Sequence, residues 1–339
     1  MNYILKNENA LYYECGYSCD NAIFINLGSE KFFLTDSRYQ EEAKETIKNA
    51  TVIITNNLHK RANKIIKKAK IKKLIYDPRD LSIYDFEKIT NKLDIKLKPK
   101  VSFSHKKRII KSEDELNLIR EAVRLGSESF DRFAYLINKY GLDKDEYELT
   151  YMAETVLSKY GRRKLSFEPI IAINENASKP HATPTKKKLK KDDLLLVDAG
   201  LKYKRYCSDR TRTVSIIDNF GFSLEQKFKT KKIQKAYDTV LKAHDNAIEK
   251  ARSGMKAKEI DALTRDIIDK AGFGKYYIHS TGHGVGLDIH EMPYISSMSK
   301  TTIEDNMVFT IEPGIYIPNE FGIRIEDMVV MRNGRVEVL

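Results

Sequence analysis

The 339-residue sequence has no long hydrophobic run and few cysteines. No window approaches about eighteen uninterrupted apolar residues, which argues against a membrane-spanning helix. Residues 1–8 lack a basic start followed by an apolar stretch, so we expect no secretory signal. Cys15, Cys19 and Cys207 are odd in number and form no C-x-x-C pair, which argues against a disulfide framework. The sequence therefore predicts a cytoplasmic protein.

The charge of the chain is strongly positive, at +12. Clustered lysines and arginines can bind nucleic acid by releasing counterions from phosphates. Here the basic residues form short, scattered groups, such as Lys186-Lys187-Lys188, which do not interleave with aromatic residues as in a single-strand-binding surface. The sequence also contains no zinc-finger spacing. We therefore expect a solvated, lysine-rich surface and no specific nucleic-acid partner.

Residues 1–108 are predicted to form a smaller α/β domain without obvious chemistry of its own. Two apolar strands at 21–27 and 31–35 flank Gly28-Ser29-Glu30, which is a hairpin signal. The following patterns predict, in order, a helix at 38–50, a strand at 52–54, a helix at 60–70 and a strand at 74–76.

A second domain is predicted at 112–339. Ser112-Glu113-Asp114-Glu115 is a capping box, in which the Ser and Glu side chains satisfy backbone donors at a helix start. The first half is expected to contain helices at 112–139 and 146–160, followed by strands at 169–174, 194–200 and 205–217. The second half is expected to contain helices at 223–252 and 256–271, followed by strand-like runs ending in 307–317 and 322–331. This repeated order predicts a duplicated α/β unit with a central cleft between its halves.

Four carboxylates stand at or near the ends of predicted strands. Asp198 follows three apolar residues, and Glu312 follows a mostly apolar run. Asp209 lies eleven positions after Asp198, and Glu326 lies fourteen positions after Glu312. A carboxylate at the end of a buried run is costly unless it is paired, protonated or bound to a metal. Four carboxylates in one cleft would repel one another, and two divalent cations would neutralise them, with His283 as a neutral fifth ligand.

Each of these residues has an ordinary alternative when taken singly. A lone Asp near a strand end is more often a turn or surface group, and a lone His is more often structural. The glycine-rich string 282–286 superficially resembles a phosphate-binding loop but lacks its lysine and its strand–loop–helix context. Cys207 could be a soft metal ligand, although a small buried residue is the favoured interpretation. Only the ordered set favours a metal site.

The ordered set resembles the metallopeptidases of the pita-bread fold, family M24, which include methionine aminopeptidase, aminopeptidase P and prolidase. This resemblance implies a pita-bread catalytic domain preceded by a creatinase/prolidase-type α/β domain. All five metal-ligand positions of the family are present, which disfavours its non-enzymatic relatives and creatinase. Further strings are similar to the proline-specific branch: Pro180-His181, His279 four residues before His283, His290-Glu291-Met292-Pro293, Arg324 two residues before Glu326, and Leu34-Thr35-Asp36-Ser37-Arg38-Tyr39.

The resemblance also implies roles for these residues. Asp198 would bind one metal, His283 and Glu312 the other, and Asp209 and Glu326 both. Glu312 would also carry a proton to the leaving nitrogen. Three histidines would face the substrate, and one arginine would clamp a ligand carboxylate: His181, His279 and His290, and Arg324. The carboxylate-rich ligand set favours two Mn ions, with Co, Zn or Fe as alternatives.

The resemblance implies an exopeptidase acting on peptides with proline at the second position. The favoured function is that of an Xaa-Pro aminopeptidase, which releases the first residue from longer peptides. Prolidase, which cuts Xaa-Pro dipeptides, is the close alternative, and methionine aminopeptidase is a weaker third. A non-enzymatic binding protein on the same fold is the alternative from another class. The resemblance further suggests a homodimer.

Overall fold

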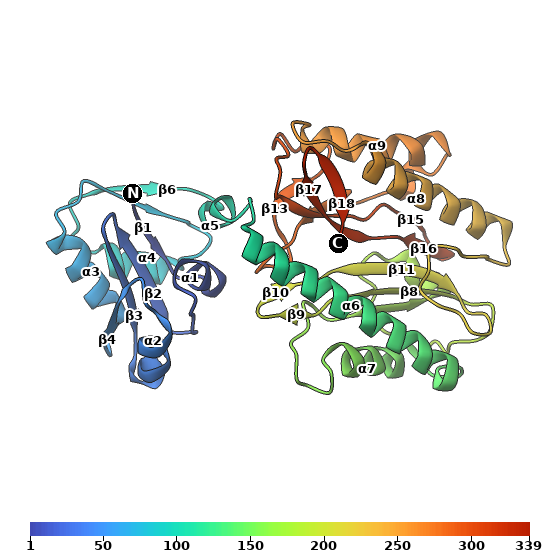
Figure 1. Cartoon of the computed structure of the whole chain (residues 1–339), viewed down its shortest axis with the longest axis horizontal. Helices are drawn as coiled ribbons and strands as arrows, with labels where there is room; N and C mark the ends of the chain where they lie inside the picture. Colours follow the sequence, from blue (N-terminus) through green and yellow to red (C-terminus); the bar gives the residue numbers. More distant parts are fainter. The chain divides into compact units, whose positions relative to one another are not determined.

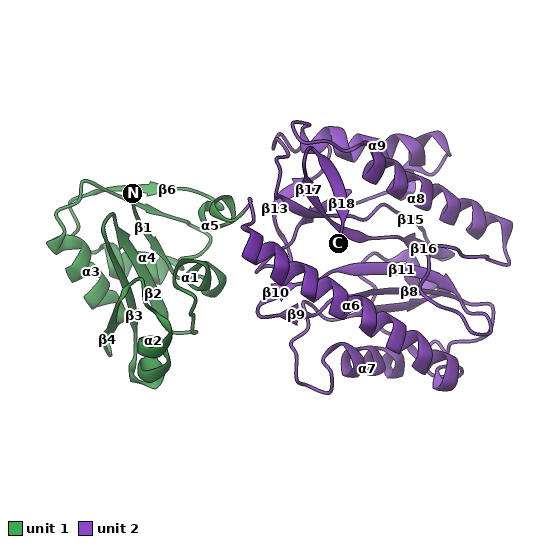
Figure 2. Ribbon diagram, viewed as in Figure 1, with its two compact units in different colours: residues 1–108 green, residues 109–339 purple.

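The computed structural model describes residues 1–339, which divide into two compact units, 1–108 and 109–339 (Figure 2). Both units mix helices with sheets (Figure 1). None of the helices combines the length and the apolar composition that a membrane crossing requires.

The first unit is built on a six-stranded sheet in the order β4-β3-β2-β1-β5-β6. Its strands are β1 Asn2–Leu5, β2 Ala22–Leu27, β3 Glu30–Thr35, β4 Thr51–Ile54, β5 Lys73–Tyr76 and β6 Lys96–Pro99. Its helices are α1 Glu8–Cys15, α2 Gln40–Thr46, α3 Leu58–Lys68, α4 Ile83–Thr90 and α5 Phe103–Lys107. The predicted hairpin is confirmed: β2 and β3 pair antiparallel, and Gly28 supplies the positive φ of +83° that the turn requires.

One helix of this unit is shorter than predicted. A 3₁₀ turn at Ser37–Tyr39 precedes α2, which ends at Thr46 instead of residue 50. Ile47 leaves the helix with an extended backbone and buries its side chain to 5% exposure. Burial of this apolar side chain therefore accompanies the end of the helix.

The first half of the second unit packs two helices against a three-stranded sheet in the order β11-β8-β7. Its elements are α6 Glu113–Tyr140, α7 Glu146–Leu157, β7 Ile170–Ile173, β8 Leu194–Ala199, the hairpin β9 Lys202–Tyr203 and β10 Tyr206–Cys207, and β11 Arg210–Ser215. The predicted capping box of Ser112 and Glu115 is confirmed at the start of α6. The single strand predicted at 205–217 is instead divided, because Ser208 and Asp209 bond elsewhere with their backbone N–H groups.

The second half repeats this order with a five-stranded sheet, β13-β12-β14-β17-β18. Its elements are α8 Lys231–Lys250, α9 Ala257–Lys270, β12 Gly282–Gly284, β13 Glu291–Ile295, β14 Val308–Ile311, the hairpin β15 Gly314–Ile317 and β16 Phe321–Arg324, β17 Asp327–Arg332 and β18 Arg335–Val338. The prediction that a helix begins at residue 223 is wrong. The Gln226 side chain accepts from Ser215 N and donates to the carbonyls of Gly221 and Ser223, which holds this segment as a loop.

The two halves are joined through β11. Thr211 and Glu326 form an antiparallel bridge, and the Thr213 hydroxyl donates to the carbonyl of Arg324 at 3.0 Å and accepts from its N–H at 3.0 Å. The buried Arg212 guanidinium donates to the Glu326 carbonyl at 2.6 Å. These contacts bring the strands of both halves together, as the repeated order of elements predicted.

Candidate metal centre

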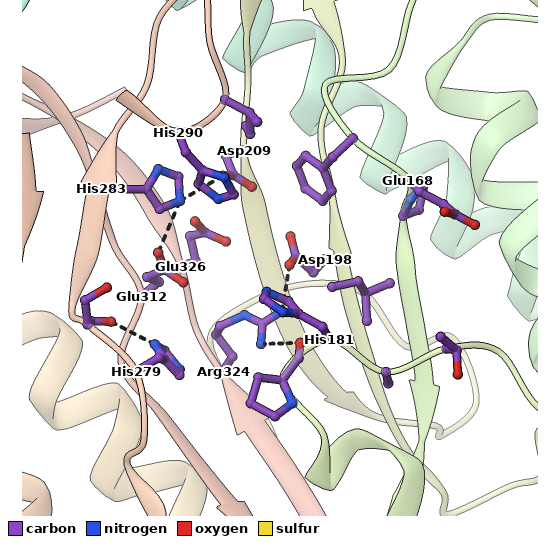
Figure 3. A pocket seen from close by; sticks show the side chains of 18 of the residues that line it. Glu168, His181, Asp198, Asp209, His279, His283, His290, Glu312, Arg324 and Glu326 are labelled. Carbon is purple, nitrogen blue, oxygen red and sulfur yellow. Dashed lines mark hydrogen bonds and ion pairs between the residues drawn. The ribbon is translucent and has the colours of Figure 1, made fainter. Parts of the chain in front are cut away.

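A cavity of about 560 Å³ lies within the second unit (Figure 3). All nine residues that the sequence singled out for chemistry line it: His181, Asp198, Asp209, His279, His283, His290, Glu312, Arg324 and Glu326. Cys207 is not among the lining residues; its thiol is fully buried elsewhere. The fold therefore gathers residues that are up to 145 positions apart in the chain, from His181 to Glu326.

The five predicted ligands come from strand ends or strand junctions. Asp198 lies near the end of β8, where it pairs with Thr211 of β11, and Asp209 immediately precedes β11. Glu312 follows β14, and Glu326 lies between β16 and β17. Termination of a buried strand allows a polar side chain to reach the cavity while the preceding apolar residues stay in the core. The strand ends thus position the carboxylates.

His283 is held on the short strand β12 between two glycines. A Cβ at Gly282 would clash with the Thr310 carbonyl, so only glycine allows this close approach of β12 to β14. The His283 Nε2 atom lies 3.3 Å from Glu312 Oε1 and 3.6 Å from Asp209 Oδ2. Ligand atoms of Asp209, His283 and Glu326 all lie within 4.8 Å of one another, which is a spacing that a metal ion could bridge.

The carboxylates of this cluster hold protons more tightly than usual. Burial and the neighbouring Glu326 raise the pKa of Asp209 well above its ordinary value. Burial and Glu312 do the same to the pKa of Glu326. Burial also raises the pKa of Glu312, to about 7. Without a cation, these acids cannot all ionise together.

The residues present fit divalent cations. Burial lowers the pKa of His283, so its imidazole is neutral and able to act as a ligand. Asp198 Oδ1 is buried without any hydrogen-bond donor, which is expensive in a protein interior. A set of four carboxylates and one neutral imidazole is a donor set that suits divalent ions.

Arg324 connects this cluster to its surroundings. Its side chain is almost fully buried and donates to Asp198 Oδ2 at 2.6 Å and to the Tyr316 hydroxyl at 2.7 Å. It also donates to Thr211 Oγ1 at 3.0 Å, and Thr211 in turn donates to Glu326 Oε2 at 2.6 Å. One guanidinium thus orients carboxylates from both halves of the unit.

His279 uses both of its ring nitrogens within the protein. Its Nδ1 lies 2.7 Å from the Ser280 carbonyl, which can only accept, so Nδ1 carries the proton. Nε2 therefore accepts from the Tyr316 hydroxyl, 2.9 Å away. Burial lowers the pKa of His279 to about 4, which keeps the ring neutral. In this arrangement no N–H of His279 is free to donate to a substrate.

His181 and His290 are more open to solvent than His279. The His290 ring lies edge-on to His283, with centroids 4.3 Å apart. Burial and the neighbouring His283 lower the pKa of His290 to about 4. Both histidines can therefore present ring N–H groups to a molecule in the cavity.

Sequence reasoning missed several residues that support or line the site. Thr211 and Tyr316 follow the ligands Asp209 and Glu312 by two and four positions, a spacing that could have identified them. Asp261 of α9 accepts from the Thr281 N–H and hydroxyl, and Arg265 donates to the His279 carbonyl at 3.0 Å. These two helical residues anchor the segment before His283, and no local pattern marked them.

Comparisons with known proteins agree with this geometry. Residues 117–333 match the model of metallopeptidase family M24, and residues 2–111 match that of the Creatinase/Prolidase N-terminal domain. The uncharacterized peptidase YqhT of Bacillus subtilis is 33% identical over 98% of this chain and 91% of its own length. An uncharacterized peptidase of Staphylococcus haemolyticus is 40% identical over 68% of this chain, and the match spans 62% of that protein.

Three solved structures are similar along the whole chain, each covering 99% of it. The Xaa-Pro dipeptidase from Bacillus anthracis has a TM-score of 0.90, with 29% identity and 92% of its chain covered. The prolidase from Pyrococcus furiosus has a TM-score of 0.87, with 32% identity and 95% covered. The X-Pro aminopeptidase from Thermotoga maritima has a TM-score of 0.87, with 28% identity and 94% covered. The chain belongs to metallopeptidase family M24, with a creatinase/prolidase-type domain preceding a pita-bread catalytic domain.

Proposed function

We propose that this protein hydrolyses the peptide bond between an N-terminal residue and a following proline. The observation that carries the proposal is the convergence of Asp209, His283, Glu312 and Glu326 in one cavity. Similar solved structures are named as Xaa-Pro peptidases, which supports the proline specificity. We further propose that the protein acts in the cytoplasm as a homodimer.

The proposed ligand set would hold two divalent ions. Asp198 would bind one, His283 and Glu312 would bind the other, and Asp209 and Glu326 would contribute to both. We favour Mn, with Co, Zn or Fe as alternatives. Such a pair of ions supplies Lewis-acid polarisation of the scissile carbonyl and an acidified water nucleophile.

The chain's own residues orient the substrate and move the proton. Glu312 takes a proton at its carboxylate and delivers it to the leaving proline nitrogen. His181 and His290 donate ring N–H groups to substrate oxygens, including the developing oxyanion. Arg324 acts through Asp198, whose carboxylate it orients at 2.6 Å. His279, which the sequence predicted to face the substrate, forms the wall of the proline pocket in this proposal and donates to no substrate atom.

Two specificities fit this chemistry. We favour release of the first residue from longer peptides, as in an Xaa-Pro aminopeptidase. The second candidate is a dipeptidase, which the names of the similar structures from Bacillus anthracis and Pyrococcus furiosus favour. The two activities differ in whether the carboxylate on proline is free.

The test is an assay of the purified protein reconstituted with Mn, Co, Zn or Fe. An Xaa-Pro dipeptide and an Xaa-Pro-Xaa tripeptide are compared, and Asp209→Asn serves as the metal-site control. Cleavage before proline that is lost in Asp209→Asn is the expected result. A folded protein that cleaves neither peptide with any of the four metals would refute the proposal and favour a non-enzymatic binding protein.

A further inference from the structure

A buried ion pair connects the start of the second unit to the loop that carries His290. Lys111 Nζ lies 2.6 Å from Glu291 Oε1, and both side chains are 1% exposed. Neither of these two residues lines the cavity. The removal of two charges from water is costly and offsets much of their attraction, so a buried ion pair is a weak source of stability. The position of this pair indicates a second role.

The lysine end of the pair is fixed by backbone contacts. The Lys111 N–H donates to the Asn306 carbonyl at 2.9 Å. Ile110, directly before Lys111, forms an antiparallel bridge with Met307, which immediately precedes β14. The ammonium group is thus presented from a backbone segment that is attached to the five-stranded sheet.

The Glu291 carboxylate lies against the loop 285–290, which joins β12 to β13. A Cβ at Gly286 would lie 2.6 Å from Glu291 Oε1, so a side chain at this position would clash with the carboxylate. The Asp288 N–H lies 3.4 Å from the other oxygen, Oε2. The Gly286 carbonyl accepts from the Cys207 N–H at 2.8 Å, which attaches the loop to β10. The loop therefore packs around a carboxylate whose charge Lys111 compensates.

The same loop places His290 in the cavity, one residue before Glu291 (Figure 3). Ile289, the preceding residue, lines the cavity as well. His283 is held by separate contacts, because its N–H donates to Thr310 Oγ1 at 3.1 Å and β12 pairs with β14. Loss of the ion pair should therefore displace His290 and leave His283 on its strand.

We propose that Lys111 and Glu291 are positioning residues that hold His290 in place for its contact with the substrate. The inference rests on the proposed hydrolysis before proline, in which His290 donates to substrate oxygens. The ion pair acts through the loop 285–290 and takes no direct part in bond cleavage. A displacement of about 1 Å in a group that orients the substrate can cost on the order of 10²-fold in rate, so a loop without its anchor should slow the reaction.

The experiment removes both charges together, because a single substitution leaves a buried charge without its partner and can unfold the protein. The double variant carries Lys111→Met and Glu291→Gln, and circular dichroism and urea titration check that it is folded. Glu291→Gln alone, which keeps the shape of the side chain, is the second variant. The metal-loaded proteins are assayed with Ala-Pro and Ala-Pro-Ala, so that either specificity gives a signal. We expect kcat/KM to fall by on the order of 10²-fold, mainly through kcat, while calorimetry shows an unchanged stoichiometry of metal binding.

A double-mutant cycle with His290→Ala identifies the group through which the ion pair acts. In the His290→Ala background, the two substitutions should lower kcat/KM by no more than about twofold, because the displaced ring is already absent. A merely structural role would lower kcat/KM by the same factor in both backgrounds. Lys232→Met removes an exposed 2.6 Å ion pair with Glu320 outside the cavity, and this matched control should leave kcat/KM unchanged.

Histidine NMR of the metal-free protein gives a readout that needs no activity. The imidazole signals of His290, assigned with His290→Ala, should shift in the double variant, whereas those of His244, buried on α8, should not. Unmoved His290 signals, a kcat/KM within about twofold of the wild-type value, or equal losses with and without His290 would each overturn the inference. So would a fully active His290→Ala variant. A folded wild-type protein that cleaves neither peptide would instead refute the proposed function, and the NMR comparison would still test how His290 is held.

Discussion

The stability of the metal-free protein should fall as pH rises through neutrality. Burial raises the pKa of Glu312 to about 7 in the folded protein, against an ordinary value of 4.5. The folded state therefore binds this proton more tightly than the unfolded chain does. The stabilisation is fully present below pH 4.5 and is lost as pH rises through about 7.

The size of the effect follows from the same values. The difference between 4.5 and about 7 corresponds to roughly 3 kcal/mol of unfolding free energy. The pKa values of Asp209 and Glu326 are raised as well, so their contributions have the same sign and extend to higher pH. Divalent ions compete with protons for these carboxylates, so the metal-loaded protein should become more stable as pH rises.

Urea unfolding in the presence of a chelator, at about pH 5.5 and about pH 8, measures this dependence. Glu312→Gln is the control, because its amide does not titrate, and it should remove a large part of the loss. Metal-free protein that is equally stable or more stable at the higher pH would refute the reasoning. So would a Glu312→Gln variant that keeps the full dependence.

Three further predictions concern the neighbouring contacts. Arg324→Met leaves Asp198 as an uncompensated buried charge and should lower the unfolding free energy of the metal-free protein by about 3–5 kcal/mol, measured by urea titration; a loss below about 1 kcal/mol would contradict the burial argument. Tyr316→Phe leaves His279 Nε2 without its donor and should cost about 1–3 kcal/mol in the same assay, whereas an unchanged midpoint would contradict a stabilising hydrogen bond between these two side chains. Asp209→Asn should abolish stoichiometric binding of two metal ions in calorimetry while the protein stays folded by circular dichroism; full binding would remove Asp209 from the ligand set.

Local signals in the sequence were sufficient for much of the fold. Gly28 supplies the positive φ of its hairpin, and Ser112 with Glu115 caps α6, because each feature depends only on neighbouring residues. The start predicted at residue 223 for α8 was wrong, since Gln226 bonds to the backbone of Ser215 on β11. A helical pattern cannot reveal a partner that lies outside its own segment.

The five proposed ligands could be selected from the sequence because a carboxylate at the end of a buried apolar run is costly without a partner, and because the order and spacing of the five residues resemble those of family M24. Their roles remain proposals. The residues that support the proposed ligands had no comparable pattern in the sequence. Asp261 and Arg265 lie on α9 in an ordinary helical pattern.

The sequence by itself indicated the family, much of the order of elements and the candidate metal ligands, because these depend on residue type and spacing along the chain. Only the tertiary structure decided that both nitrogens of His279 are engaged and that Arg324 donates to Thr211, Pro180, Tyr316 and Asp198. Hydrogen bonding and charge balance depend on which groups meet in space, and the fold brings these groups together from distant parts of the chain.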